Sequence, residues 1–423
     1  HIKNIITLYH FSADDHQYCL LTNAEGVLAK VIVGVKDKYN LWSLANLSLT
    51  LPEKNYQISA AEFTQLAIGW GLGAYQFTRY KAAKRQPAKL VLNNNSDIAH
   101  ICNTVESIYW VRDLINIPPE DMLPQHLASE AEKLAAAFAA TITIIKGDDL
   151  LTQNYPSIHA VGRASVHTPR LIDLRWGNPQ HKKITLIGKG VCFDSGGLDI
   201  KTASGMLSMK KDMGGAAHAL GLARMIMAEK LPVCLRVLVP AVENAIAGNA
   251  YHPSDVIKTR KGLTVEVTNT DAEGRLILCD ALAEACTEQP DLLIDFATLT
   301  GASRVALGAE IANIFCDNKA IVQHLVDMGE QLRDPIYPLP LYKDYRYLLD
   351  SDIADLCSAN VKNAYAGAIT AALFLNEFVD SHINWIHLDL MGASIHHKPG
   401  RPVGGDAQSL RAILQYLRQF ITE

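Results

Sequence analysis

The sequence predicts an α/β protein with a mostly parallel C-terminal sheet, helices on both faces of that sheet, and a smaller N-terminal α/β domain. Near-continuous apolar strands alternate with helical segments through most of the chain, as in parallel sheets buried on both faces. The chain has 423 residues, more than one hydrophobic core usually serves. Prolines at 118, 119 and 124 end a long helical pattern. We therefore place the boundary there, with domains at 1–118 and 119–423.

The N-terminal domain is predicted from alternating apolar residues, which indicate strands, and from a 3.6-residue period, which indicates helices. Its strands are expected at 4–11, 17–22, 29–35 and 90–97. Its helices are expected at 58–80 and 98–116, and the second of them connects the two domains.

The C-terminal domain alternates between the two kinds of element. Strands are expected at 141–146, 157–162, 170–176, 183–190, 234–242, 262–267, 291–299 and 383–391. Helices are expected at 123–140, 213–230, 276–286 and 407–421. Ligands of such sheets bind beyond the carboxyl ends of the strands. The polar residues that follow the strands are therefore the candidates for a functional site.

Composition narrows the class of protein. Hydrophobic residues make up 49% of the chain and charged residues 20%, which is typical of a packed globular protein. The net charge of −5 and the absence of a basic stripe indicate no nucleic-acid partner. No apolar run is long enough to span a bilayer, and the first residues lack a signal-peptide pattern. The eight cysteines form no C-x-x-C pair, so we expect free thiols and a cytoplasmic protein.

Three strands of the predicted sheet run into unusual polar segments at their C-terminal ends, and the second of these segments also opens a helix. The segments are LIGKGVCFDSGGLDIK (186–201), MKKD (209–212) and NTDAEGRL (269–276). Burying so much charge is costly unless it is paired or bound to a metal. The residues of interest are Lys189, Asp194, Asp199, Lys201, Asp212, Asp271, Glu273 and Arg275.

If these segments face one crevice, at least four carboxylates meet there. Carboxylates at close range repel one another and raise each other's pKa unless a cation neutralises them. Oxygen ligands with few histidines favour Mg²⁺, Mn²⁺ or Zn²⁺. More carboxylates than one ion needs indicates two ions about 3.5–4 Å apart, as in metal-assisted hydrolysis. Each carboxylate alone is more often a surface or capping residue, so the inference depends on the set.

Other catalytic signatures are missing from the sequence. There is no H-E-x-x-H motif of a zinc protease and no phosphate-binding loop. The stretch FDSGG lacks the flanking glycine of a G-x-S-x-G motif, so Ser195 is not expected to be a nucleophile.

The three segments resemble the leucyl (cytosol) aminopeptidase family of two-metal exopeptidases, and NTDAEGRL is the most specific of them. Further similar stretches are DLLIDFATLTGA (291–302), AGAITAALFLNEF (366–378), WIHLDLMG (385–392) and GRPV (400–403). Together they cover residues 115–420 in one collinear order. The resemblance implies a hydrolase that releases single N-terminal residues from peptides, with water activated by two metal ions and bicarbonate as the general base.

The resemblance also implies a role for each polar residue. The metal ligands would be Lys189, Asp194, Asp212, Asp271 and Glu273. Asp194 and Glu273 would bridge two ions, which would be Mn²⁺ or Zn²⁺, with Mg²⁺ as a further candidate. Lys201 would be an electrophilic catalyst, and Arg275 would hold the bicarbonate ion. Asp199 is not a family ligand and is interpreted as turn structure.

By the same resemblance we expect peptides with a free N-terminus as substrates and a homohexamer as the assembly. The pocket for the N-terminal side chain would be lined by Met209, Thr298, Gly301 and the 390–394 segment. Met391 stands where family members usually carry alanine. A larger, flexible side chain there predicts a preference for small or slender residues over bulky aromatic ones.

Two alternatives stay open. One is a non-catalytic relative that serves as a binding or scaffold protein, which would be expected to have lost metal ligands. The other is a different two-metal hydrolase such as a phosphoesterase, although such sites usually contain more histidine and no lysine ligand.

Overall fold

The computed structural model describes residues 7, 9–36, 40–59, 63–92, 97–360, 362–363 and 365–422. The chain divides into two compact units. The smaller unit is His1–Tyr109 with His396–Val403, and the larger unit is Trp110–Ile395 with Gly404–Glu423. The units divide inside helix α4 (Ile98–Asn116), whose bounds match the predicted connector helix. The domain boundary at residue 118 stays a proposal.

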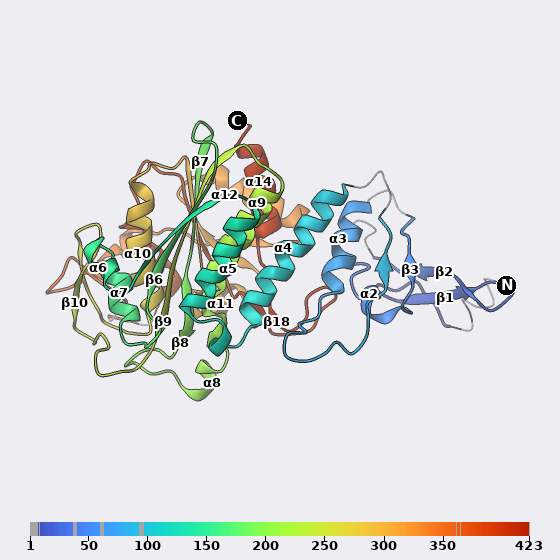
Figure 1. Ribbon diagram of the computed structural model, residues 1–423, viewed down its shortest axis with the longest axis horizontal. Coiled ribbons are helices and arrows are strands. Elements are labelled where there is room, and N and C mark those ends of the chain that lie inside the picture. The colour runs from blue at the N-terminus through green and yellow to red at the C-terminus, as the bar shows by residue number, and fades with distance from the viewer. Residues whose placement is uncertain are drawn as a thin grey trace. The chain divides into compact units, whose positions relative to one another are not determined.

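A nine-stranded sheet forms the centre of the larger unit (Figure 1). Its strands are β5 (Thr141–Lys146), β6 (Arg170–Gly177), β7 (Lys182–Gly188), β8 (Gly190–Asp194), β9 (Val233–Asn244), β12 (Leu292–Ala297), β13 (Ala312–Phe315), β14 (Ile336–Pro338) and β16 (Trp385–Asp389).

The order along the sheet is β14-β13-β16-β12-β7-β9-β6-β5, and β8 also pairs with β9. The central strands β16, β12, β7 and β9 run parallel to one another. The β13–β16, β6–β9 and β5–β6 pairs are antiparallel. The α/β class with a parallel centre is therefore confirmed, and the sheet as a whole is mixed.

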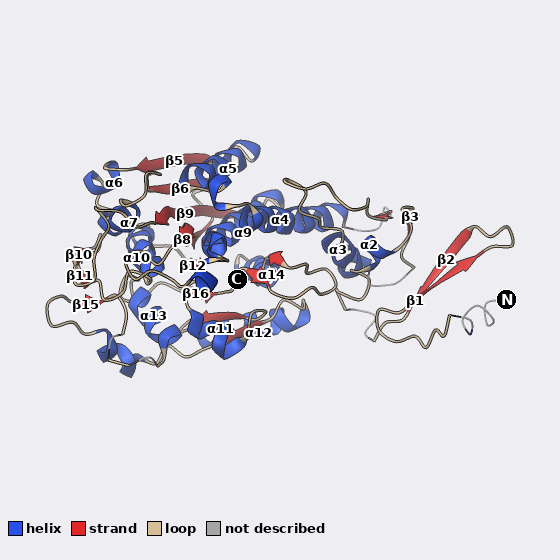
Figure 2. Cartoon of the chain, turned by 90° about the horizontal axis from the view of Figure 1, so that it is seen from below, coloured by secondary structure: helices blue, strands red, loops and turns tan. Residues whose placement is uncertain are grey.

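Helices cover both faces of this sheet, as predicted (Figure 2). One face carries α7 (Pro156–Gly162), α10 (Glu273–Cys286) and α13 (Gly367–Asn376). The other carries α5 (Pro124–Ala137), α9 (Gly214–Ala228) and α14 (Leu410–Phe420). Gly215 brings the start of α9 close to the sheet, because a Cβ there would lie 2.1 Å from the Phe296 carbonyl oxygen.

Further helices and strands complete the larger unit. The helices are η1 (Pro119–Asp121), α6 (Asp149–Thr152), α8 (Ala203–Met206), η2 (Met209–Met213), α11 (Gly301–Leu307), α12 (Lys319–Gln331) and η3 (Lys343–Leu349). The remaining strands are β10 (Val256–Lys258), β11 (Thr264–Glu266), β15 (Leu356–Cys357), β17 (Ala393–Ser394) and β18 (Gly404–Gly405). The first three of these strands form a small sheet that leads into the turn at 267–272.

One predicted strand of the larger unit is wrong. Residues 157–162 form helix α7, which begins at Pro156. Proline suits the first helical position because its missing N–H needs no partner there. The Asp280 carboxylate of α10 accepts hydrogen bonds from the backbone N–H groups of Ser157 and Ile158 at 2.8 and 3.3 Å. A partner far away in sequence therefore caps this helix.

The smaller unit contains a hairpin of β1 (Tyr18–Thr22) and β2 (Leu28–Val33), and a parallel pair of β3 (Asn55–Tyr56) and β4 (Lys89–Leu90). Its helices are α2 (Leu47–Thr50), α3 (Phe63–Gly73) and the first part of α4. The core includes Leu44, Leu47, Leu51, Leu66 and Trp70.

Three of the elements predicted in the N-terminal region differ from the structure or lie partly outside the described residues. The helix expected at 58–80 is shorter, because residues 58–59 and 74–80 are not helical. The helix ends at Gly73, which lies so close to Ala45 that a Cβ on residue 73 would be 1.6 Å from the Ala45 carbonyl oxygen. Half of the strand expected at 4–11 (residues 4–6 and 8) and half of the one expected at 90–97 (residues 93–96) lie outside the described residues, and residues 7 and 9–11 are not in a strand. None of the helices in the described part of the chain combines the length and apolar character needed to cross a membrane.

Candidate active site

The polar residues predicted from the sequence meet at the carboxyl ends of β7 and β8. Lys189 follows β7 directly, and Asp194 is the last residue of β8. Asp212 lies on the short helix η2 that leads into α9. Glu273 is the first residue of α10, and Asp271 precedes it by two positions. Parallel strands and helix starts therefore bring distant segments to one place.

The Lys189 side chain joins two of the carboxylates. Its Nζ lies 2.9 Å from Asp212 Oδ1, 2.8 Å from Asp212 Oδ2 and 2.8 Å from Glu273 Oε1. The Nζ also donates to the Thr298 carbonyl oxygen at 3.1 Å. All three charged side chains are at most 3% exposed, so water screens this group very little.

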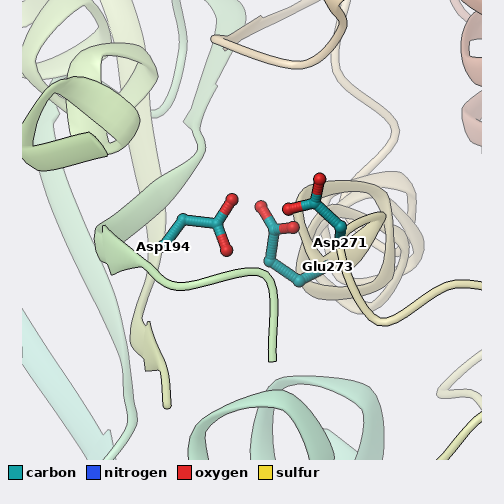
Figure 3. A group of neighbouring side chains, drawn as sticks. All are labelled: Asp194, Asp271 and Glu273. Atoms are coloured by element: carbon teal, nitrogen blue, oxygen red, sulfur yellow. The ribbon is translucent and has the colours of Figure 1, made fainter. Parts of the chain in front are cut away.

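Lys201 joins the other two carboxylates. Its Nζ lies 2.8 Å from Asp194 Oδ2 and also pairs with Asp271 Oδ1. Asp194, Asp271 and Glu273 point toward one another (Figure 3), and one oxygen atom of each lies within 4.8 Å of the others. Two lysines thus hold four carboxylates in one small region.

The crowding of carboxylates changes how easily they ionise. Burial, followed by the charge of Asp212, raises the pKa of Asp194 to about 6. Burial, followed by the charge of Asp194, raises the pKa of Glu273 well above its usual range. Burial alone would lower the pKa of Lys189, but the charges of Asp212 and Glu273 outweigh it and raise that pKa. Acidic groups are therefore in excess at the site.

A glycine allows Lys189 to reach Glu273. A Cβ on Gly274 would lie 2.6 Å from Lys189 Cε and 2.8 Å from its Nζ. Any larger residue would displace the amine from the carboxylates. This contact explains why the sequence places glycine in the first turn of α10, where it weakens a helix.

Arg275 also lies in the first turn of α10, and it is 8% exposed. Its Nη1 donates to the Ser358 carbonyl oxygen at 2.7 Å, while its Nε has no hydrogen-bond partner among the described residues. Burial lowers the pKa of Arg275 to about 10. The guanidinium therefore keeps donor capacity beside the acidic residues.

Sequence reasoning missed the residues that fasten these segments together. The Asn244 side chain donates to Asp194 Oδ1 at 2.8 Å and to the Thr270 carbonyl oxygen at 3.1 Å. Asp199, interpreted as turn structure, accepts a hydrogen bond from Thr270 N at 2.8 Å. Asn244 ends an apolar strand, so the rule that selected the other polar residues could also have selected it.

Only some of the residues predicted to line the substrate pocket contact one another or the acidic site. Thr298 Oγ1 donates to Asp212 Oδ1 at 2.7 Å, which ties this residue to the acidic group. A Cβ on Gly392 would lie 3.2 Å from Thr298 Cγ2, so the segment after β16 is adjacent. Met209 begins η2, Gly301 begins α11, and Met391 is half-buried. Among the described residues, no hydrogen bond joins Met209 or Gly301 to Met391.

The residues at this site fit divalent cations. Carboxylate oxygens are the preferred ligands of Mn²⁺ and Mg²⁺, and Zn²⁺ also accepts nitrogen ligands. Glu273 Oε2 is buried and has no hydrogen-bond partner in the described residues, so its lone pairs are available to coordinate a cation. The donor set therefore suits one or more hard or borderline ions.

Comparison with known proteins settles the family. Residues 109–414 match the model of the cytosol aminopeptidase family, catalytic domain, and residues 4–93 match the M17 aminopeptidase, N-terminal domain. The chain belongs to the cytosol aminopeptidase family. The suspected resemblance is confirmed, and the protein is a peptidase of the aminopeptidase class.

Individual relatives and solved structures agree with this assignment. A probable cytosol aminopeptidase of Roseiflexus castenholzii is 39% identical over 388 residues, which cover 88% of this chain and 78% of that protein. The crystal structure of a cytosol aminopeptidase from Coxiella burnetii is 47% identical, with a TM-score of 0.96, covering 99% of this chain and 92% of that one. The bottromycin maturation enzyme BotP in complex with Mn is 27% identical, with a TM-score of 0.91 and coverage of 98% and 96%.

Proposed function

We propose that the protein is a two-metal aminopeptidase that releases single residues from peptides with a free N-terminus. The observation that carries this proposal is the convergence of Asp194, Asp271 and Glu273, of which one oxygen atom each lies within 4.8 Å of the others. Asp212 is linked to them through Lys189. Four carboxylates from three separate segments need cations, and the two lysines neutralise only half of their charge.

The proposed metal ligands are Lys189, Asp194, Asp212, Asp271 and Glu273. Lys189 would bind as a neutral amine, because bound dications would lower the pKa that the carboxylates raise in their absence. Asp194 and Glu273 would be shared by both ions, which would be Mn²⁺ or Zn²⁺, with Mg²⁺ as a further candidate. The Mn complex of BotP, which has the same fold, supports this proposal. Two bound dications would lower the pKa of water toward neutrality and polarise a carbonyl oxygen.

Lys201 and Arg275 are the proposed catalytic residues. Burial lowers the pKa of Lys201, but the charge of Asp194 outweighs it and raises that pKa, so the amine stays charged at neutral pH. A fixed positive charge stabilises the negative charge that develops on the substrate carbonyl oxygen. Arg275 would hold a bicarbonate ion, which supplies a general base for proton transfer. Its unpaired buried Nε supports this role.

The pocket for the N-terminal side chain is proposed to include Met209, Thr298, Gly301 and Met391. Thr298 contacts both Asp212 and the segment after β16, so this pocket would adjoin the metal ligands. Met391 would limit its depth. We therefore propose a preference for small or slender N-terminal residues over bulky aromatic ones.

Metal-stripped protein gives the direct test of this function. We expect no activity after chelation, recovery on adding Mn²⁺ or Zn²⁺, and release of single residues from unblocked peptides but not from N-acetylated ones. A phosphoester substrate serves as a control and should not be cleaved. Peptide trimming that survives chelation, or equal cleavage of blocked peptides, would contradict the proposal.

The bicarbonate role needs a separate experiment. Removing dissolved carbonate should lower the rate of the wild-type enzyme, and adding bicarbonate should restore it. The Arg275→Ala variant should be slow and insensitive to bicarbonate. A variant that responds to bicarbonate as the wild type does would show that Arg275 does not hold the ion.

Assembly and location are further proposals. The family resemblance supports a homohexamer, which sedimentation analysis of the purified protein would test. The described cysteines are all free, and the matching relatives are named cytosol aminopeptidases, which supports a cytoplasmic location. Fractionation of the source cells would test it.

A further inference from the structure

Asn244 lies beside the acidic site, on the strand that pairs with the one carrying Asp194. It is the last residue of β9, it is fully buried, and it is the register partner of Asp194 in the parallel β8–β9 pair. Its side chain therefore starts from the same level of the sheet as the Asp194 carboxylate. This position is fixed by the strand pairing and not by a loop.

Both hydrogens of the Asn244 amide are used, and they go to two different segments. Nδ2 donates to Asp194 Oδ1 at 2.8 Å and to the Thr270 carbonyl oxygen at 3.1 Å. Thr270 immediately precedes Asp271. One amide group thus connects the carboxylate at the end of β8 to the turn that carries Asp271 and Glu273.

These contacts determine which oxygen of Asp194 faces the site. Oδ1 accepts two hydrogen bonds, from Asn244 Nδ2 and from Gly196 N, both at 2.8 Å. Oδ2 is left to face Lys201, 2.8 Å away. A carboxylate with one oxygen fixed in this way loses little further freedom when the other oxygen binds a cation.

The Thr270 end of the connection is also secured. Tyr251 donates its hydroxyl to the Thr270 carbonyl oxygen at 2.7 Å, and Thr270 N donates to Asp199 Oδ2 at 2.8 Å. Thr270 Oγ1 donates to the Gly196 carbonyl oxygen at 2.6 Å. Thr270 is thus bonded directly to the backbone and turn that follow Asp194, while the Asn244 side chain is the link between Thr270 and the Asp194 carboxylate itself.

We propose that Asn244 is a positioning residue that sets the separation of Asp194 from Asp271 and Glu273 and thereby tightens metal binding. This inference rests on the proposed function of the site. Asn244 acts through the carboxylates and does not touch the substrate. Its removal should therefore weaken the affinity for metal and leave the KM for peptide unchanged once metal is saturating.

The Asn244→Leu variant keeps a similar volume and removes both hydrogen bonds. We expect calorimetric titration of the metal-stripped variant with MnCl₂ to show about 10–100-fold weaker binding than the wild type, the usual range for residues that orient metal ligands. Saturating Mn²⁺ should restore kcat. Damage to the fold would not be reversed in this way.

Asn313→Leu is the matched control. Asn313 is a fully buried asparagine of the same sheet, on β13, and neither atom of its amide has a hydrogen-bond partner among the described residues. Its replacement should leave Mn²⁺ affinity within about twofold of the wild type, since it removes no contact that orients a metal ligand. If Asn244→Leu does not fold, the Asn244→Ser variant takes its place, because serine is too short to bridge the two segments. Its Mn²⁺ affinity and its kcat at saturating Mn²⁺ then test the inference.

Wild-type Mn²⁺ affinity in a folded Asn244 variant would overturn the inference, and so would an equal loss in Asn313→Leu. If the wild type itself binds no Mn²⁺, the proposed function fails and the inference fails with it. If the wild type binds Mn²⁺ and trims peptides while the Asn244 variants behave identically, the inference alone is wrong.

Discussion

Strand β9 passes through two clusters of charge that are built in different ways. Near its beginning, Arg236 belongs to an arginine cluster, and at its end Asn244 contacts the acidic site. The arginine cluster holds three guanidinium groups and three carboxylates. Its members are Arg175, Arg236, Arg260, Asp173, Glu284 and Glu288.

Charges in the arginine cluster are balanced. Arg236 Nη2 lies 2.7 Å from Asp173 Oδ2 and 2.7 Å from Glu284 Oε1, and Arg260 also pairs with Glu284. Burial lowers the pKa of Arg236, but Asp173 and Glu284 outweigh it and raise that pKa. At the acidic site, four carboxylates share two lysines, and burial raises the pKa of Asp194 and Glu273. Balanced pairs stabilise a fold, whereas an excess of one sign is typical of a binding site.

The largest effect is expected on catalytic activity, which should depend on the acidic site and not on the arginine cluster. Glu273→Gln removes one proposed metal ligand, and the loss of several kcal/mol of charge stabilisation corresponds to a decrease in kcat/KM of about 10²–10⁴-fold. The free energy of unfolding of the metal-free protein should stay the same or rise, because one of several repelling charges is gone. Steady-state kinetics and urea denaturation measure the two quantities.

Glu288→Gln in the arginine cluster is the control for that experiment. The Glu288 side chain is 39% exposed and pairs with Arg236, which lies eight residues before Asn244 on β9, so kcat/KM should not change. A comparable loss of activity in both variants would show that the distinction between the clusters is false.

The second prediction concerns stability. Arg236→Met leaves Asp173 and Glu284 without their shared partner, and breaking a buried pair in this way costs about 3–5 kcal/mol. The midpoint of urea denaturation should fall, while Mn²⁺ affinity measured on the remaining folded protein stays at the wild-type value. An unchanged midpoint of urea denaturation would mean that the arginine cluster does not stabilise the fold.

The third prediction is that the shape of the proposed substrate pocket sets the substrate preference, while the charges of the acidic site set the Mn²⁺ affinity. Met391→Ala should raise the ratio of phenylalanyl-amide to alanyl-amide kcat/KM about tenfold, because a methylene in an apolar pocket is worth about 1–3 kcal/mol. Mn²⁺ affinity should not change. Met391→Leu has a similar volume and should keep the wild-type ratio. If the wild type already turns over phenylalanyl amides as fast as alanyl amides, the proposed pocket is incorrect.

The smallest effect is expected at the rim of the arginine cluster. Arg175 pairs with Glu288 at 2.7 Å, but its side chain is 45% exposed. Arg175→Ala should therefore reduce the free energy of unfolding by about 0–1 kcal/mol, and added salt should shrink the difference. A loss as large as that of Arg236→Met would mean that exposure does not weaken these pairs.

Much of the larger unit could be predicted from the sequence, because its strands are apolar throughout and its polar residues stand at their ends. Lys189 and Asp194 stand at the ends of β7 and β8, as the strand-end rule predicts. Asp212 comes instead from η2, and Asp271 and Glu273 follow β11, which belongs to a separate small sheet. Their individual roles stay predictions. The family assignment rested on the same short segments and is confirmed by the comparisons.

Other features depend on partners that are distant in sequence. The run at 157–162 is apolar and short, and periodicity alone does not distinguish a buried strand from a buried helix. The cap from Asp280, more than 100 residues away, decides it. Asn244 was missed for a similar reason. The strand-end rule could have marked Asn244 as a candidate, but a single asparagine at the end of a strand is a common turn residue. Only the pairing of β8 with β9 shows that it faces Asp194.

Residues 396–403 leave the larger unit, become part of the smaller one, and are followed by residues that return to the larger unit. There Arg401 lies over the Trp42 ring, 5.8 Å from its centroid. A single cut in the gene cannot separate the two units cleanly, because the larger fragment would keep a piece of its neighbour. Exchanging the N-terminal region with that of another family member would therefore require replacing this octapeptide together with it.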